Sequence, residues 1–133
     1  KLLILARESG YELEESDIKS SNFIPQDLFI GTEEEFWKGV QKLDADFETK
    51  RNQLSAENKK WRYIATFEEG NSSASLKAVS SNSPFFDLEG SNNIILITTE
   101  RYNEYPMQIK GYGAGADVTA AGVFADIIRI ANI

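Results

Sequence analysis

The sequence contains no cysteine and no histidine. Without cysteine there is neither a disulfide nor a thiolate ligand, which fits a cytoplasmic protein without requiring one. The absence of both residue types leaves a zinc or other soft-metal site without its usual ligands, so we predict no metal site. No apolar run reaches about 18 residues, and no membrane span is therefore predicted.

Positive charge is also scarce, because 14 Lys and Arg stand against 21 Asp and Glu, for a net charge of −7. The basic side chains form no clustered patch, so nucleic acid is not an expected partner. Hydrophobic residues make up 41% and charged residues 26%, close to the globular average. The composition predicts one acidic, soluble, intracellular domain and names no activity.

The first residues predict a helix that begins at full strength. Residues 2–6 are strong helix formers, and Gly10 stands where a glycine after a helix C-terminus is expected. No N-cap residue precedes them. We therefore expect a longer protein that continues upstream of Lys1.

Two more helices are expected before the chain changes to strands. A short extended piece over 17–23 and a turn at Ile24-Pro25 come first. Thr32 and Glu35 fit a capping box at the start of one helix, and the other runs from about residue 44 to 56 with acids early and bases late. The apolar side chains expected to be buried are Phe36, Trp37 and Val40 in the first helix and Leu43, Phe47 and Leu54 in the second.

The middle of the chain has the patterns of strands. Residues 61–67 alternate, 69–73 read as a hairpin loop, and a second strand covers 76–79. The apolar run at 94–97 is typical of a central strand buried on both faces, and 107–110 is a further short strand. This order predicts an α+β fold in which helices cover a mixed sheet, with most of the sheet supplied by 61–99.

The chain closes with a glycine-rich turn and a helix from about residue 117 to 131. This helix is apolar nearly all round, and only Thr119, Asp126 and Arg129 form a thin polar seam. Such a helix needs packing partners on more than one side. We expect that a neighbouring domain is missing at this end as well.

Residues 111–116 satisfy G-x-G-x-x-A between a strand and a helix, so backbone N–H groups there could face a phosphate. The full dinucleotide fingerprint also needs a second strand and an acid about 20 residues on, and the printed sequence ends first. The alternative is a tight turn with close packing. Lys1, taken alone, likewise predicts a solvated surface residue. The residue patterns by themselves favour these structural interpretations.

The whole chain nevertheless resembles the homoserine dehydrogenases. Residues 1–10 are similar to the segment that follows D-V-A-R in that family, with Lys1 as the lysine that ends the motif. The most specific stretch is 111–126, whose Gly-Tyr-Gly start is similar to the form fused behind an aspartate kinase. One departure is Ser83, where many members have histidine. Shorter landmarks agree in order and spacing at 23–25, 43–44, 61–64, 83–85 and 90–95.

The resemblance implies reversible reduction of L-aspartate 4-semialdehyde to L-homoserine by NADPH or NADH, a step towards threonine and methionine. It also implies a homodimer with a small-molecule substrate. Residues 1–110 would be a substrate-binding and dimerisation domain, truncated at its start, and 111–133 would return to a Rossmann domain that is missing. The family's substrate carboxylates lie upstream, so the fragment alone is expected to be inactive.

Three site residues follow from the resemblance. Lys1 matches the catalytic lysine, which donates a proton to the carbonyl oxygen. Gly115 matches the position whose backbone meets the nicotinamide cofactor, and Thr119 is a weaker candidate for the same site. The alternative, from a different class, is a non-enzymatic interaction or dimerisation domain in which residues 111–115 are only a turn. Nucleotide affinity distinguishes the two.

Overall fold

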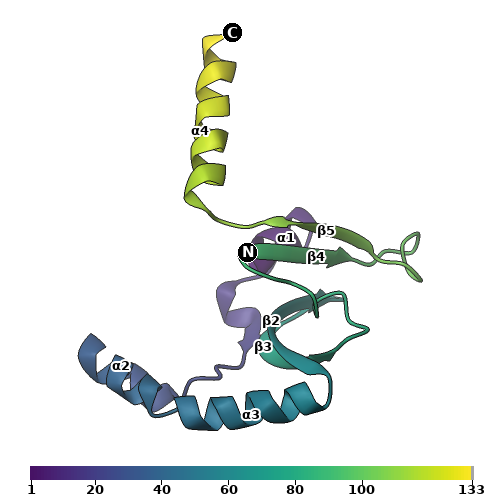
Figure 1. The fold of residues 1–133 in the computed structure, drawn as a ribbon. Helices are drawn as coiled ribbons and strands as arrows, with labels where there is room; N and C mark the ends of the chain where they lie inside the picture. The colour runs from purple at the N-terminus through teal and green to yellow at the C-terminus, as the bar shows by residue number, and fades with distance from the viewer. Residues whose placement is uncertain (133) are drawn as a thin grey trace. The chain divides into compact units, whose positions relative to one another are not determined.

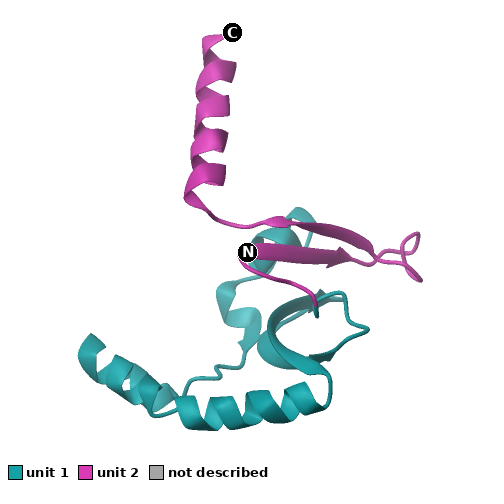
Figure 2. Ribbon diagram, in the orientation of Figure 1, with its two compact units in different colours: residues 1–86 teal, residues 87–133 magenta. Residues whose placement is uncertain are grey.

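The computed structural model describes residues 1–132, and the chain forms two compact units. Unit 1 is Lys1–Phe86 and unit 2 is Asp87–Ile133 (Figure 2). Helices and a mixed sheet occur together, which confirms the predicted α+β class. Among residues 1–132 no helix is both long and apolar enough to cross a membrane.

Unit 1 is built on a long β-hairpin. Strands β2 (Lys59–Glu68) and β3 (Asn71–Ser80) pair antiparallel along their full length. Glu69 and Gly70 connect them with φ angles of 49° and 81°, as in the type I′ turn that suits the twist of a hairpin. Strand β1 (Ile18–Ser20) pairs parallel to β3, so the order is β1-β3-β2 and the sheet is mixed.

One face of β2 is covered by aromatic side chains from other segments of unit 1. Helix α3 (Asp44–Ala56) packs against this strand, and Figure 1 shows it beside the hairpin. Because side chains alternate along a strand, Trp61, Tyr63 and Phe67 share one face. Each ring meets another ring edge to face. The distances between ring centroids are 5.5 Å for Trp61 and Phe47, 6.0 Å for Tyr63 and Phe23, and 4.8 Å for Phe67 and Tyr11.

Helix α1 (Leu2–Glu8) begins and ends as the sequence predicts. Its Ala6 is completely buried. Gly10 has φ 88°, the left-handed conformation that favours glycine, and its N–H donates to the Arg7 carbonyl at 2.9 Å. Two short 3₁₀ turns follow α1, at Glu15–Asp17 and Gln26–Phe29.

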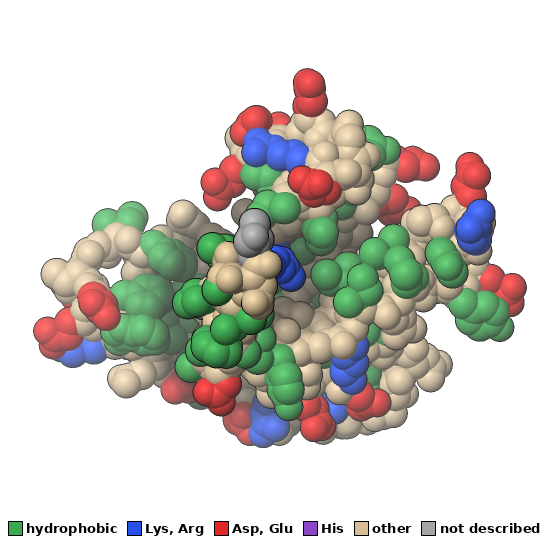
Figure 3. Space-filling view, turned by 90° about the horizontal axis from the view of Figure 1, so that it is seen from above, with side chains coloured by type: hydrophobic (Ala, Val, Ile, Leu, Met, Phe, Trp, Pro, Cys, Tyr) green, Lys and Arg blue, Asp and Glu red, His purple; other side chains and the backbone are tan. Residues whose placement is uncertain are grey.

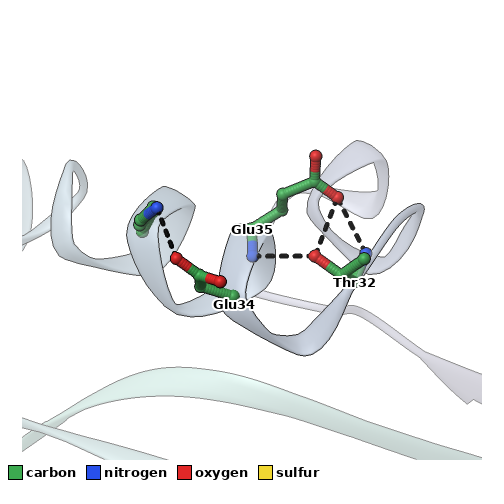
Figure 4. A network of polar contacts seen from close by, with 4 residues as sticks. Thr32, Glu34 and Glu35 are labelled. Carbon is green, nitrogen blue, oxygen red and sulfur yellow. Dashed lines mark hydrogen bonds and ion pairs between the residues drawn. The ribbon is translucent and has the colours of Figure 1, made fainter.

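Helix α2 (Glu33–Gln41) starts with the predicted capping box (Figure 4). The Glu35 N–H donates to the Thr32 hydroxyl at 3.3 Å, and the Thr32 N–H donates to the Glu35 carboxylate at 2.9 Å. The backbone N–H and the hydroxyl of Thr32 both hold the pKa of Glu35 below its usual value. Elsewhere on the same helix, the Lys38 ammonium group donates to the Glu34 carboxylate at 2.6 Å, across one helical turn.

The prediction that α2 buries Trp37 is wrong. Its side chain is 56% exposed, and its indole N–H donates to Glu33 at 3.3 Å. The buried residue of α2 is Gly39, because a Cβ there would lie 2.5 Å from Leu28 Cδ2. Leu28 therefore packs against the helix at Gly39. The other predicted side chains, Phe36 and Val40, are half-buried.

Unit 2 contains strands β4 (Asn92–Ile97) and β5 (Met107–Tyr112), which pair antiparallel, and helix α4 (Ala116–Ala131). The prediction that 94–97 is a central strand of the main sheet is wrong, since β4 pairs with β5 in a separate two-stranded sheet. No residue between 87 and 132 is buried. Two strands alone are marginally stable in water, so unit 2 depends on surfaces outside itself.

The capping box makes a prediction about stability. Thr32→Ala removes a hydroxyl that satisfies a helix N–H, and the free energy of unfolding should fall by about 1 kcal/mol. Glu35→Ala should also destabilise the protein, with a pH dependence. A depressed carboxyl pKa stabilises the fold above its ordinary value near 4.5. That contribution is lost as the pH falls through the lowered pKa of the folded protein.

Denaturant unfolding followed by tryptophan fluorescence at pH 7 and at pH 3 checks this. The difference between the wild type and Glu35→Ala should shrink at pH 3. Glu34→Ala is the matched control, because Glu34 is exposed and lies outside the box. A Glu35→Ala difference that is equal at both pH values would contradict the assignment.

Candidate functional site

The glycine-rich turn joins β5 to α4. The Gly113 N–H donates to the Ser91 carbonyl at 2.9 Å, which continues the strand pairing one residue beyond Tyr112. Gly115 is the N-cap of α4, and its carbonyl accepts from the Thr119 N–H at 3.0 Å. The turn is thus tied to β4 at one end and becomes helix at the other.

Gly113 and Gly115 differ in how much space unit 2 leaves for a side chain at their positions. A Cβ at Gly113 would overlap the side-chain amide of Asn93 and lie 3.3 Å from the Ser91 carbonyl oxygen, so a side chain there would have to displace the exposed Asn93 amide. Gly115 has φ −173°, an extended conformation open to any residue, and a Cβ there would meet no atom within 4 Å. Within the described residues of unit 2, neither the backbone angle nor a neighbouring atom explains why position 115 is glycine.

The start of α4 is open to a ligand. Gly115 offers no side chain to cap the helix, and the first N–H groups of a helix have no partner within it. Such N–H groups and the positive end of the helix dipole favour an anionic or electron-rich group. Asp117 stands in the same first turn, which places one negative charge nearby.

A shallow apolar groove runs from the turn along α4. Gly115 and Thr119 both line it, one helical turn apart, so the structure brings these two predicted site residues together. The groove is lined by small side chains near the turn and by larger ones further along, namely Ala114, Ala116, Ala120, Val123, Phe124 and Ile127.

The rest of α4 is uncovered. Every described residue of the helix is exposed, including Phe124 at 63% and Ile130 at 71%. Figure 3 looks down on the end of α4 and shows hydrophobic side chains gathered around it. The predicted polar seam is present, since Arg129 and Asp126 form an ion pair at 3.6 Å. The helix therefore presents a broad apolar surface and a narrow charged one.

Lys1 lies in unit 1, whereas Gly115 and Thr119 lie in unit 2. The Lys1 carbonyl accepts from the Leu5 N–H at 3.2 Å and so fixes the first turn of α1. The side chain is exposed, and within residues 1–132 its ammonium group makes no ion pair. Over the same part of the chain, no three acidic side chains gather closely enough to hold a metal ion.

Sequence reasoning missed Asn93. Its amide donates to the Ser91 carbonyl at 3.2 Å and lies against Gly113, so it forms one wall of the turn. The signal that could have revealed it is the register of the β4–β5 hairpin, which sets Asn93 opposite Gly111. That register depends on a long connecting loop, and no short turn motif fixes it in the sequence.

Comparison with known proteins gives a consistent result. The model of the homoserine dehydrogenase family matches residues 1–128. A bifunctional aspartokinase/homoserine dehydrogenase from Haemophilus influenzae is 41% identical over 97% of this chain and 16% of that protein. A chloroplastic bifunctional aspartokinase/homoserine dehydrogenase from Zea mays is 40% identical over 99% of this chain and 15% of that protein. The chain thus spans about a sixth of the length of these relatives.

A solved structure of a protein of unknown function from Candida auris is also similar. It superposes with a TM-score of 0.78 at 39% identity, over 99% of this chain and 38% of that one. The similarity therefore covers both units and includes the glycine-rich turn.

Proposed function

This chain belongs to the homoserine dehydrogenase family, and from that premise we propose that it supplies the substrate-binding and dimerising part of an enzyme. That enzyme reversibly reduces L-aspartate 4-semialdehyde to L-homoserine with NADPH or NADH. The step serves threonine and methionine biosynthesis. The fragment alone is inactive, because most of the groups that bind the substrate and the cofactor lie elsewhere in the enzyme. We place the protein in the cytoplasm, although the maize relative is named chloroplastic.

The observation that carries this proposal is the glycine at position 115. Its own unit would accept a side chain there, both in backbone angle and in space. Gly111 and Gly122 have the same free space, but of these three glycines Gly115 is the one that lines the groove along α4, so we infer that a group approaches its backbone from outside. The nicotinamide ring of the cofactor is such a group, and Thr119 lies one turn further along the same groove.

Residues 1–110 form the substrate-binding and dimerisation domain, and 111–133 pack back on the dinucleotide-binding domain of the complete enzyme. The exposed apolar surface of α4 supports this division, because a helix with large side chains on most sides is stable only when they are covered. Burial of each large side chain contributes about 1.5–3 kcal/mol.

Lys1 acts as the general acid. A nicotinamide cofactor, when bound, would supply the hydride for the carbonyl carbon, and negative charge would then develop on the carbonyl oxygen. The Lys1 ammonium group stabilises that charge and donates its proton to the oxygen, and in the reverse direction the neutral amine takes the proton from the hydroxyl. A flexible, exposed lysine can reach a bound aldehyde without displacing any partner of its own.

The role of Gly115 can be tested with Gly115→Val in the full-length protein. Because a Cβ at this position meets nothing in the chain, the variant should keep the unfolding temperature of the wild type. Its affinity for NADPH should fall by about tenfold or more, since the added methyl groups project towards the cofactor. Gly113→Val is the matched control and should lower the unfolding temperature, because Asn93 already fills that space. Loss of fold in Gly115→Val with unchanged affinity in the folded fraction would overturn the assignment.

The role of Lys1 makes a kinetic prediction. Lys1→Ala in the full-length enzyme should lower kcat by roughly 10²–10⁴-fold, the usual contribution of a positioned general acid. Lys1→Arg should recover little, because guanidinium keeps its proton at any working pH. NADPH affinity, measured by direct titration, should change much less. A Lys1→Ala enzyme within a few-fold of the wild-type kcat would show that this lysine is only a solvated surface residue.

The proposed homodimer predicts a mass in solution. Light scattering should report a dimer at micromolar concentration, with an obligate interface of about 2,000 Å² or more. Ile64→Lys, on the face of β2 opposite the aromatic cover, should weaken the dimer. Gln53→Lys adds the same charge on exposed α3 and should leave it intact. A strict monomer for the wild type at high micromolar concentration would contradict this proposal.

A further inference from the structure

Asn93 lies where the glycine-rich turn leaves the hairpin. Its amide nitrogen donates to the Ser91 carbonyl at 3.2 Å, and the same carbonyl accepts from the Gly113 N–H at 2.9 Å. One acceptor therefore ties together the strand before the turn, the turn itself and the Asn93 side chain. In the strand register Asn93 stands opposite Gly111. Its neighbours on the other strand are therefore Gly111 and, beyond Tyr112, Gly113.

The contact with Gly113 shows how closely the amide and the turn fit. A Cβ on Gly113 would overlap Asn93 Nδ2 and lie 3.1 Å from its Cγ. The glycine thus leaves room for the amide, and the amide fills the space that a side chain at 113 would take. Neither Gly111 nor Gly115 has such a neighbour, since a Cβ at either position meets nothing within 4 Å.

We propose that Asn93 is a positioning residue for the cofactor site, which fixes the path from β5 into α4 and thereby the place of the Gly115 backbone. This inference rests on the function proposed above, because Gly115 is the residue through which Asn93 would act. Asn93 itself touches neither the cofactor nor the substrate in this proposal.

The physical reason is the freedom of the turn. Glycine samples more backbone conformations than any other residue. Glycines stand on both sides of Tyr112, at 111 and 113, and a third at 115 comes directly before α4. A turn left free would have to be ordered when the cofactor binds, and that entropy would weaken affinity. The Asn93 amide removes this cost in advance by holding Gly113 from one side while the Ser91 carbonyl holds its N–H.

Asn92 provides a matched control within the same strand. Its amide also donates to a backbone carbonyl just before β4, that of Glu89, at 3.0 Å. Since side chains alternate along a strand, Asn92 points to the opposite face from Asn93 and pairs with Tyr112 rather than a glycine. It shares the local structural role but has no contact with Gly113.

The test uses Asn93→Ala, Asn93→Asp and Asn92→Ala in the full-length enzyme. Asn93→Asp keeps the size of the side chain but replaces the donor with a carboxylate that repels the Ser91 carbonyl. Both Asn93 variants should raise the NADPH dissociation constant and the cofactor KM by roughly five- to tenfold, the effect of losing about one hydrogen bond. The KM for the aldehyde should stay within about twofold, and Asn92→Ala should bind NADPH like the wild type.

Fluorescence titration of NADPH, steady-state kinetics and thermal unfolding distinguish the outcomes. Wild-type protein that does not bind NADPH or NADH would overturn the proposed function and this inference with it. Wild-type binding together with unchanged affinity in both Asn93 variants would overturn the role of Asn93 alone. An Asn93 variant with a lower unfolding temperature but unchanged NADPH affinity in its folded fraction would also overturn the role of Asn93. If Asn93→Ala does not fold, the NADPH affinity of Asn93→Asp tests the proposal.

Discussion

The pairing of β2 with β3 is the interaction on which unit 1 depends. Its full-length antiparallel register creates the face that aromatic rings from three other segments cover, and its outer edge at β3 accepts β1 in parallel. The hydroxyl of Ser72 on β3 is buried and donates to the Asp17 carbonyl at 3.0 Å, which holds the segment leading into β1. Without the hairpin, the segments around α1 and α3 would have no common surface to pack on.

The hairpin buries only a few of the apolar side chains of the chain's described residues. Among the described residues, the buried hydrophobic side chains are Ala6, Leu13 and Val79, and many larger ones stay exposed. A chain of this length normally buries roughly two thirds of its unfolded surface. The uncovered side chains lie in both units, on α1, α2 and β2 as well as on α4 and the β4–β5 hairpin.

Local features of the fold were predictable from the sequence, and long-range ones were not. The capping box of Thr32 and Glu35 involves residues three apart, so its chemistry is visible in the sequence, and the structure confirms it. The buried side of α2 lies at Gly39, where Leu28 packs against it from another element, and Trp37 is exposed. The run at 94–97 correctly indicates a strand, but its partner depends on pairing across a long loop. In the site, Gly115 and Thr119 came from a family resemblance, and Asn93 needed the hairpin register.

The glycine-rich turn shows why a motif cannot be interpreted from its letters alone. Position 113 is glycine because Asn93 and Ser91 crowd it from within the chain, which is the structural explanation of such motifs. Position 115 has the opposite character, with free space and an unrestrictive backbone. The structural explanation therefore holds at position 113, whereas contact with a ligand at position 115 stays a prediction. The hairpin holds the turn at Gly113 through the Ser91 carbonyl, whereas the backbone at Gly115 lies open at the start of α4.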